Sequence, residues 1–299
     1  MRFTVAILVL IFLSGCSSLR YSDYERGQVW CNDRYLHKLN SPFHKKHLDV
    51  AEKGYIYALA GALVLQGNSQ EDKDHYFPTP LRLELVDKPK RDSSGFEVGT
   101  FKLYETKNRE KLKEIVIAFT GSNDSDDWFW TNLFFSKKQY KLAEEYVKKI
   151  AEQYSDTRIV IAGYSLGGGL AVHVAKIPST KKHISEVWAF NPSPKTYSNG
   201  DEDKRIWLAA VEGEALEKMR WPIFRIWPGV YDIGSPEKQT ADEYYLIQST
   251  SIYGHFRWVL ARNMLHVADL SIYNRTKAEK TEPLMILKGS NFESCQQFR

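Results

Sequence analysis

Apolar residues in the middle of the chain form short unbroken runs, and these runs alternate with segments of helical periodicity. Runs at residues 114–119, 158–162 and 186–190 are rich in β-branched and aromatic side chains and predict buried strands. Residues 138–154 carry apolar side chains on one side only, which predicts a helix between the first two runs. Strands that alternate with helices favour an α/β fold with a mainly parallel central sheet and helices on both faces.

The N-terminal part of this pattern predicts one more helix and two more strands. Residues 45–65 place apolar side chains at helical spacing and predict an amphipathic helix. Residues 81–86 and 96–104 alternate apolar and polar side chains and are separated by a polar segment containing Pro89 and Gly95, so we expect an antiparallel pair.

The C-terminal part is less regular. Residues 206–217 fit either a strand or a helix, and residues 222–227 predict a short strand. Residues 255–270 predict the last strong helix, and the charged tail beyond Asn274 shows no clear pattern. The sequence contains neither an internal repeat nor a long linker, which favours one domain over residues 45–299.

The first residues predict export and lipidation. Met1-Arg2 precedes an apolar run from Val5 to Leu13, which is too short to span a membrane but suits a signal peptide over residues 1–15. The run ends in Leu13-Ser14-Gly15-Cys16, which resembles the lipobox of bacterial lipoproteins. That resemblance implies a lipidated Cys16, a tether and lead-in over residues 16–44, and a bacterial envelope protein, with Ser17 favouring the outer membrane.

The remaining two cysteines lie near opposite ends of the mature chain. Cys31 and Cys295 would form a disulfide if the compartment is oxidising, and two buried free thiols are an equally good interpretation. The charge balance of 41 basic and 37 acidic residues, without a basic block, argues against a nucleic-acid partner.

A candidate nucleophile lies directly after the run at residues 158–162. Gly163-Tyr164-Ser165-Leu166-Gly167 has the Gly-x-Ser-x-Gly spacing of a nucleophile elbow, and a segment of helical character follows it. Such a serine has a strained backbone at a sharp turn, and the glycines two residues away leave room for the close approach of strand and helix. The alternative is an ordinary glycine-rich turn in which Ser165 is a helix N-cap.

Several blocks together resemble the class 3 lipases of the α/β-hydrolase superfamily. Residues 115–122 are similar to that family's strand ending in Phe-Arg-Gly-Ser/Thr, with Thr120 in place of the arginine. Residues 163–168 are similar to its Gly-His-Ser-Leu-Gly-Gly, with Tyr164 in place of the histidine. The resemblance covers residues 50–270 and implies the α/β-hydrolase fold and a serine hydrolase that requires no metal or cofactor.

The triad of this superfamily runs in the order Ser, acid, His. His255 follows the plausible acids and precedes a predicted helix, so we expect it to be the base; His266 falls inside that helix. Asp232 follows the predicted strand at residues 222–227 and is the expected acid, with Asp242 as the alternative.

The oxyanion hole needs two donors. The backbone N–H of Leu166, immediately after the nucleophile, is one, and the resemblance implies that the N–H of Ser122 is the other. Residues 126–135 are rich in aromatic side chains and either form a lid that meets lipid or a buried connection.

The sequence therefore predicts a serine carboxylester hydrolase that acts on lipid or phospholipid acyl esters through Ser165, Asp232 and His255. An acyltransferase would use the same triad with an acceptor alcohol in place of water. A lipid-binding lipoprotein on a hydrolase scaffold is the non-catalytic alternative.

Overall fold

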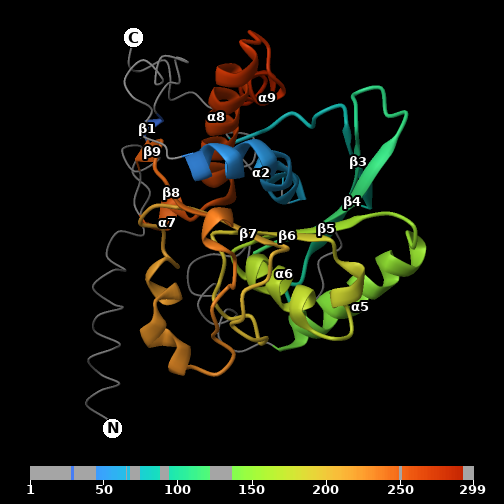
Figure 1. Ribbon diagram of the computed structural model, residues 1–299, viewed down its shortest axis with the longest axis vertical. Helices are drawn as coiled ribbons and strands as arrows, with labels where there is room; N and C mark the ends of the chain where they lie inside the picture. Colours follow the sequence, from blue (N-terminus) through green and yellow to red (C-terminus); the bar gives the residue numbers. More distant parts are fainter. Residues whose placement is uncertain are drawn as a thin grey trace.

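The computed structural model describes residues 28–29, 45–64, 66–67, 75–87, 94–121, 137–248 and 251–291 (Figure 1). A search of these residues finds no helix with the length and apolar character needed to cross a membrane. The predicted signal peptide, Cys16, Cys31, Ser122, residues 126–135 and Cys295 lie outside them, so those interpretations stay predictions.

The architecture is built on a seven-stranded sheet whose spatial order follows the sequence. Its strands are β2 (Leu83–Asp87), β3 (Val98–Tyr104), β4 (Leu112–Phe119), β5 (Ile159–Tyr164), β6 (Glu186–Phe190), β7 (Ile206–Val211) and β8 (Thr240–Tyr244). The first three strands pair antiparallel, and β4 to β8 pair parallel. The predicted antiparallel pair and the predicted mainly parallel sheet are both confirmed.

Alternating residues of each central strand enter two separate hydrophobic cores. In β4, Ile115 and Ile117 pack on the side of α5 (Lys138–Gln153) and α6 (Leu166–Lys176). Val116 and Ala118 face the opposite core, which contains α2 (Lys45–Val64) and α8 (Arg257–Thr276). Figure 1 shows these helix pairs on opposite sides of the sheet, as expected for an α/β fold. Because both faces are covered, the central strands are apolar throughout.

The helix α2 has the predicted length but not the predicted amphipathic character. From Gly54 to Val64 every side chain is buried, because this half of the helix lies between the sheet and α8. Gly54 allows the approach: a Cβ there would lie 2.3 Å from the Trp188 ring. Exposed polar residues of α2 are confined to its first half, at Lys45, Asp49 and Lys53.

Three parts of the C-terminal half differ from the sequence interpretation. Residues 222–227 do not form a strand; Pro222–Ile226 is the 3-10 helix η6, with proline in its first turn. The strand β8 was not predicted, because its sequence, Thr-Ala-Asp-Glu-Tyr, lacks the apolar run of a buried strand. Its charged residues are typical of a strand at the edge of a sheet. The charged tail contains α9 (Glu282–Lys288), whose N-cap Thr281 accepts a hydrogen bond from Leu284 N–H.

The remaining elements are short. They comprise the antiparallel pair of β1 (Gln28–Val29) and β9 (Ile247–Gln248), the helix α7 (Ser251–Gly254), and the 3-10 helices η4 (Lys181–His183), η5 (Lys218–Arg220) and η7 (Glu237–Gln239).

Candidate active site

Ser165 occupies the turn between β5 and α6 with the backbone of a nucleophile elbow. Its φ of 57° and ψ of −120° lie in a region that residues with a side chain rarely adopt. Such a conformation costs about 1–3 kcal/mol and persists only where the surroundings enforce it. Here Ser165 N–H donates to Phe190 O at 2.9 Å, and Ser165 O accepts from Ser193 N–H at 2.9 Å, so the turn is fixed by the neighbouring strand β6 and the loop after it.

The two motif glycines permit the sharpness of this turn. A Cβ on Gly163 would lie 2.0 Å from Gly167 O, and a Cβ on Gly167 would lie 2.3 Å from Phe119 O. Both contacts are with backbone atoms, which cannot move aside as a flexible side chain would. The Gly-x-Ser-x-Gly spacing is therefore a packing requirement between β5, α6 and the end of β4.

Ser165, His255 and a glutamate form a continuous hydrogen-bonded chain. His255 Nε2 lies 2.9 Å from Ser165 Oγ, and His255 Nδ1 pairs with Glu214 Oε2. The three side chains come from the elbow, the turn between α7 and α8, and the loop after β7. The structure thus brings together the predicted nucleophile and the predicted base, in the arrangement of nucleophile, base and orienting carboxylate.

Glu214 is a fully buried carboxylate with several partners. Arg220 forms an ion pair with it at 2.6 Å, and Leu216 N–H donates to it at 2.8 Å. Burial alone would raise the pKa of Glu214, but the charge of Arg220 and the contact with His255 outweigh this and lower it below its usual range. The carboxylate is therefore ionised, as a group that orients a histidine needs to be.

The structure does not place Asp232 at His255, so the predicted acid is corrected. Asp232 is 47% exposed in its side chain and pairs with Arg225 at 2.6 Å. Its other oxygen accepts from Gly234 N–H at 3.1 Å. The Nδ1 of His255 is already bound by Glu214. The alternative acid, Asp242, belongs to β8 itself.

The sequence did contain a signal for Glu214. The strand β7 ends at Val211, and Glu214 follows three residues later at the carboxyl end, where an α/β-hydrolase acid belongs. Residues 206–217 fitted both a strand and a helix, so the end of this strand was not defined. The sequence analysis predicted a strand at residues 222–227, where the structure has a 3-10 helix. The triad acid was expected after that strand, at Asp232.

Asn191 is a second residue that the sequence did not reveal. It is completely buried, and its Nδ2 lies 3.1 Å from Tyr164 Oη and 3.3 Å from the carbonyl oxygens of both Gly254 and His255. Its Oδ1 accepts from Val211 N–H at 2.8 Å. One amide therefore joins the elbow, the end of β7 and the backbone that carries His255.

Of the two predicted oxyanion-hole donors, Leu166 lies within the described residues. Leu166 is the first residue of α6, and N–H groups in the first turn of a helix have no acceptor within the helix. The helix N-terminus also favours negative charge beside Ser165. Ser122 lies outside the described residues, but Gly121 comes close: a Cβ there would lie 2.8 Å from Ser165 Cβ.

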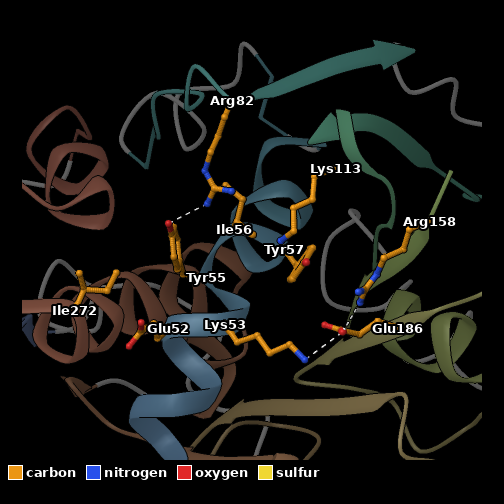
Figure 2. A pocket seen from close by; sticks show the side chains of 10 residues that line it. All are labelled: Glu52, Lys53, Tyr55, Ile56, Tyr57, Arg82, Lys113, Arg158, Glu186 and Ile272. Atoms are coloured by element: carbon orange, nitrogen blue, oxygen red, sulfur yellow. Dashed lines mark hydrogen bonds and ion pairs between the residues drawn. The ribbon is translucent and has the colours of Figure 1, made fainter. Parts of the chain in front are cut away.

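A cavity of about 380 Å³ lies among charged side chains at the amino ends of the parallel strands (Figure 2). Ser165 follows the opposite, carboxyl end of β5. Arg158 pairs there with Glu186 at 2.6 Å and with Glu114 at 3.3 Å, and Lys53 pairs with Glu186 at 3.1 Å. Arg82 pairs with Glu282 at 2.7 Å. These cations are matched by carboxylates of the protein, so the cavity is part of an ion-pair network.

Sequence comparisons relate part of this chain to known proteins. Residues 70–184 match the family profile described as the Tle-like phospholipase domain. A stretch of 91 residues is 35% identical to the extracellular phospholipase A1 of Serratia liquefaciens, and it covers 29% of this chain and 25% of that protein. The match thus spans about a quarter of the relative's length.

Solved structures give weaker similarities. The Lip2 lipase of Yarrowia lipolytica aligns with 13% identity and a TM-score of 0.42, over 74% of this chain and 93% of that one. The Rhizomucor miehei lipase aligns with 11% identity and a TM-score of 0.39, over 73% and 79%.

The family match includes Ser165 but ends before Glu214 and His255. Only the hydrogen bonds in the structure connect these two residues to Ser165. Residues 70–184, which include the nucleophile elbow, are similar to the Tle-like phospholipase domain family.

Proposed function

We propose that this chain is a serine carboxylester hydrolase that cleaves acyl esters of phospholipids. The observation that carries the proposal is the chain of contacts from Ser165 through His255 to the buried Glu214, beside a helix N-terminus. The phospholipid class is supported by the family match at residues 70–184 and by the identity to a phospholipase A1.

In the proposed mechanism, His255 Nε2 removes the proton of Ser165 as its Oγ attacks the ester carbonyl carbon. Glu214 holds the imidazole in the tautomer that accepts this proton and stabilises the imidazolium. The backbone N–H groups of Leu166 and Ser122 donate hydrogen bonds to the oxyanion in this mechanism. His255 then protonates the leaving alcohol, and water activated by His255 releases the acyl group from Ser165.

Fluorophosphonate labelling tests for the activated serine. The parent chain should be labelled, and Ser165→Ala should remove the label. His255→Ala and Glu214→Gln should strongly slow labelling, because the serine then loses its base or the group that orients the base. Asp232→Asn is the matched control and should label like the parent, because Asp232 pairs with Arg225.

A folded parent that resists labelling, both with and without detergent, would refute the hydrolase and favour the lipid-binding alternative. If labelling succeeds, phospholipid hydrolysis followed by product analysis with and without an added acceptor alcohol separates a hydrolase from an acyltransferase.

The proposed location is the bacterial envelope, with the chain anchored through a lipid on Cys16. The support is the lipobox-like Leu13-Ser14-Gly15-Cys16. Metabolic labelling with a radioactive fatty acid should mark the parent and leave Cys16→Ser unlabelled; equal labelling of both would disprove the anchor.

A further inference from the structure

Large apolar side chains are exposed on the loop that follows Glu214. Trp221 is 52% exposed, Ile223 is 69% exposed and Ile226 is 81% exposed. They lie on and just before the 3-10 helix η6, and we call these three residues the apolar patch. Exposing isoleucine and tryptophan to water is unfavourable, so a group of them on one short element indicates a binding surface.

The geometry of η6 fixes this exposure. In a 3-10 helix residues three apart lie on the same side, which places Ile223 and Ile226 together. Phe224 and Trp227, also three apart, meet edge to face with ring centroids 5.4 Å apart, and Trp227 packs against the core on the α5–α6 side of the sheet. The inner side of the turn thus anchors it, and the outer side is presented to the surroundings.

The patch is attached to the candidate active site through a short, fixed segment. Arg220, immediately before Trp221, pairs with Glu214 at 2.6 Å and donates to Pro192 O at 3.1 Å. Both Ser165 and Glu214 follow the carboxyl ends of parallel strands, β5 and β7. The patch therefore belongs to the edge of the sheet at which the ester would be cleaved.

The chemistry of the patch matches the headgroup region of a phospholipid bilayer. Tryptophan prefers the boundary between water and hydrocarbon, and isoleucine inserts beyond it. The exposed cation Lys218 lies three residues before Trp221 and complements lipid phosphates. A stable protein partner would need a much larger surface, of about 800 Å² on each side, whereas shallow insertion needs only a few side chains.

We propose that Trp221, Ile223 and Ile226 dock the protein onto the surface of a phospholipid membrane and hold the carboxyl edge of the sheet against it. The docking depends on the patch alone; its use in presenting substrate to Ser165 rests on the proposed hydrolase function.

The test compares vesicle binding with ester hydrolysis in separate assays. Residues 17–299, which contain every residue that the structure describes, are prepared without the lipid anchor. Binding to vesicles of phosphatidylcholine and phosphatidylglycerol is measured in a Ser165→Ala background, so that no lipid is consumed. Hydrolysis of a soluble short-chain ester is measured with Ser165 present.

The double substitution Ile223→Asp and Ile226→Asp should weaken vesicle binding by about tenfold or more, because two inserted side chains become charged. Hydrolysis of the soluble ester should stay at the parent's rate. The matched control is the double substitution Leu81→Asp and Met285→Asp, which charges two residues that are 67% and 51% exposed on other elements. This control should bind vesicles like the parent.

Vesicle binding that is absent in the parent, or unchanged by the double substitution while the soluble ester is hydrolysed, overturns the docking surface and leaves the hydrolase intact. Patch-dependent binding without ester hydrolysis supports the surface and rejects the proposed function. A dimer in sedimentation that the double substitution dissociates, with vesicle binding unchanged, would assign the patch to a second copy and overturn the proposal.

Discussion

Glu214 combines complete burial with a partner on each carboxylate oxygen. An isolated carboxylate would be expensive to bury, and removing one member of such a group leaves the others uncompensated. Arg220 on one oxygen and His255 on the other keep the carboxylate charged, and Arg220 is itself fixed by Pro192 O. Arg220 therefore acts through Glu214 as a positioning residue in the proposed mechanism.

Glu214→Gln should lower kcat/KM for a soluble ester by about three to four orders of magnitude, because an amide favours the wrong tautomer of His255. Asp232→Asn should leave kcat/KM within about twofold, in line with the small effect of an exposed ion pair. Steady-state kinetics on both variants checks this. A larger loss in Asp232→Asn than in Glu214→Gln would restore the acid predicted from the sequence.

His266 is buried inside α8, away from the hydrogen-bonded chain of the active site. Burial, assisted by the charge of Arg262, lowers its pKa to about 3. The unfolded chain takes up a proton at this residue near pH 6.5, while the folded chain does not until about pH 3. The contribution of His266 to stability is therefore complete above pH 6.5 and is lost as the pH falls through this window.

Lowering the pH from 7 to 5 should cost the parent about 2 kcal/mol of unfolding free energy through this one residue. His266→Leu cannot take up the proton and should show a correspondingly shallower decline, measured by urea unfolding at several pH values. Identical pH slopes in the two proteins would show that His266 is protonated equally in both states.

At the scale of elements, the elbow is the feature that the sequence specified best. The turn at Ser165 has close contacts between backbone atoms, which leave no room for a Cβ at Gly163 or Gly167. The turn therefore requires glycine at these two positions, and that spacing is visible in the sequence. The buried strands were equally clear, because a parallel sheet covered on both faces requires unbroken apolar runs. The base His255 followed from its place between a turn and a helix.

Elements that depend on tertiary context were harder to predict. The strand β8 is polar, and the segment containing η6 has the apolar composition of a strand but no strand partner. Glu214 and Asn191 have no motif of their own; their roles arise from neighbours that are distant in the sequence, such as His255 and Tyr164. Local patterns therefore pointed to Ser165 and His255, which the structure brings together, and did not point to Glu214.

Gly167→Ala should abolish fluorophosphonate labelling, because its Cβ would lie 2.3 Å from Phe119 O and neither backbone can yield without moving the elbow. Gly61→Ala is the matched control, since a Cβ there meets no atom within 4 Å and the residue lies within α2. It should raise the unfolding free energy by about 0.5–1 kcal/mol. Normal labelling of Gly167→Ala would argue against an elbow of this shape.

At the scale of the whole molecule, the two edges of the sheet are specialised differently. The carboxyl edge carries the hydrogen-bonded chain of Ser165, His255 and Glu214. The amino edge carries the ion-pair network around the cavity of Figure 2, where Arg158 connects β4 to β6 through Glu114 and Glu186. Stability at one edge can therefore change without altering chemistry at the other.

Arg158→Ala should lower the unfolding free energy by about 2 kcal/mol, below the range for a fully buried pair because its side chain is 44% exposed. Labelling of the folded variant at Ser165 should not change. Lys45→Ala, which removes a pair with side chains 86% and 54% exposed, should have no measurable effect on stability. Equal losses in the two variants would show that the network adds nothing beyond ordinary surface pairs.

The spacing of the three side chains along the chain also sets the order in which the site is completed during synthesis. His255 lies 90 residues after Ser165 and 41 residues after Glu214. A ribosome makes the N-terminal part first, so the serine emerges long before its base. A growing or truncated chain that ends before His255 carries a Ser165 hydroxyl without its base. In the proposed mechanism, ester hydrolysis can therefore begin only after the chain has been made as far as His255 and has folded.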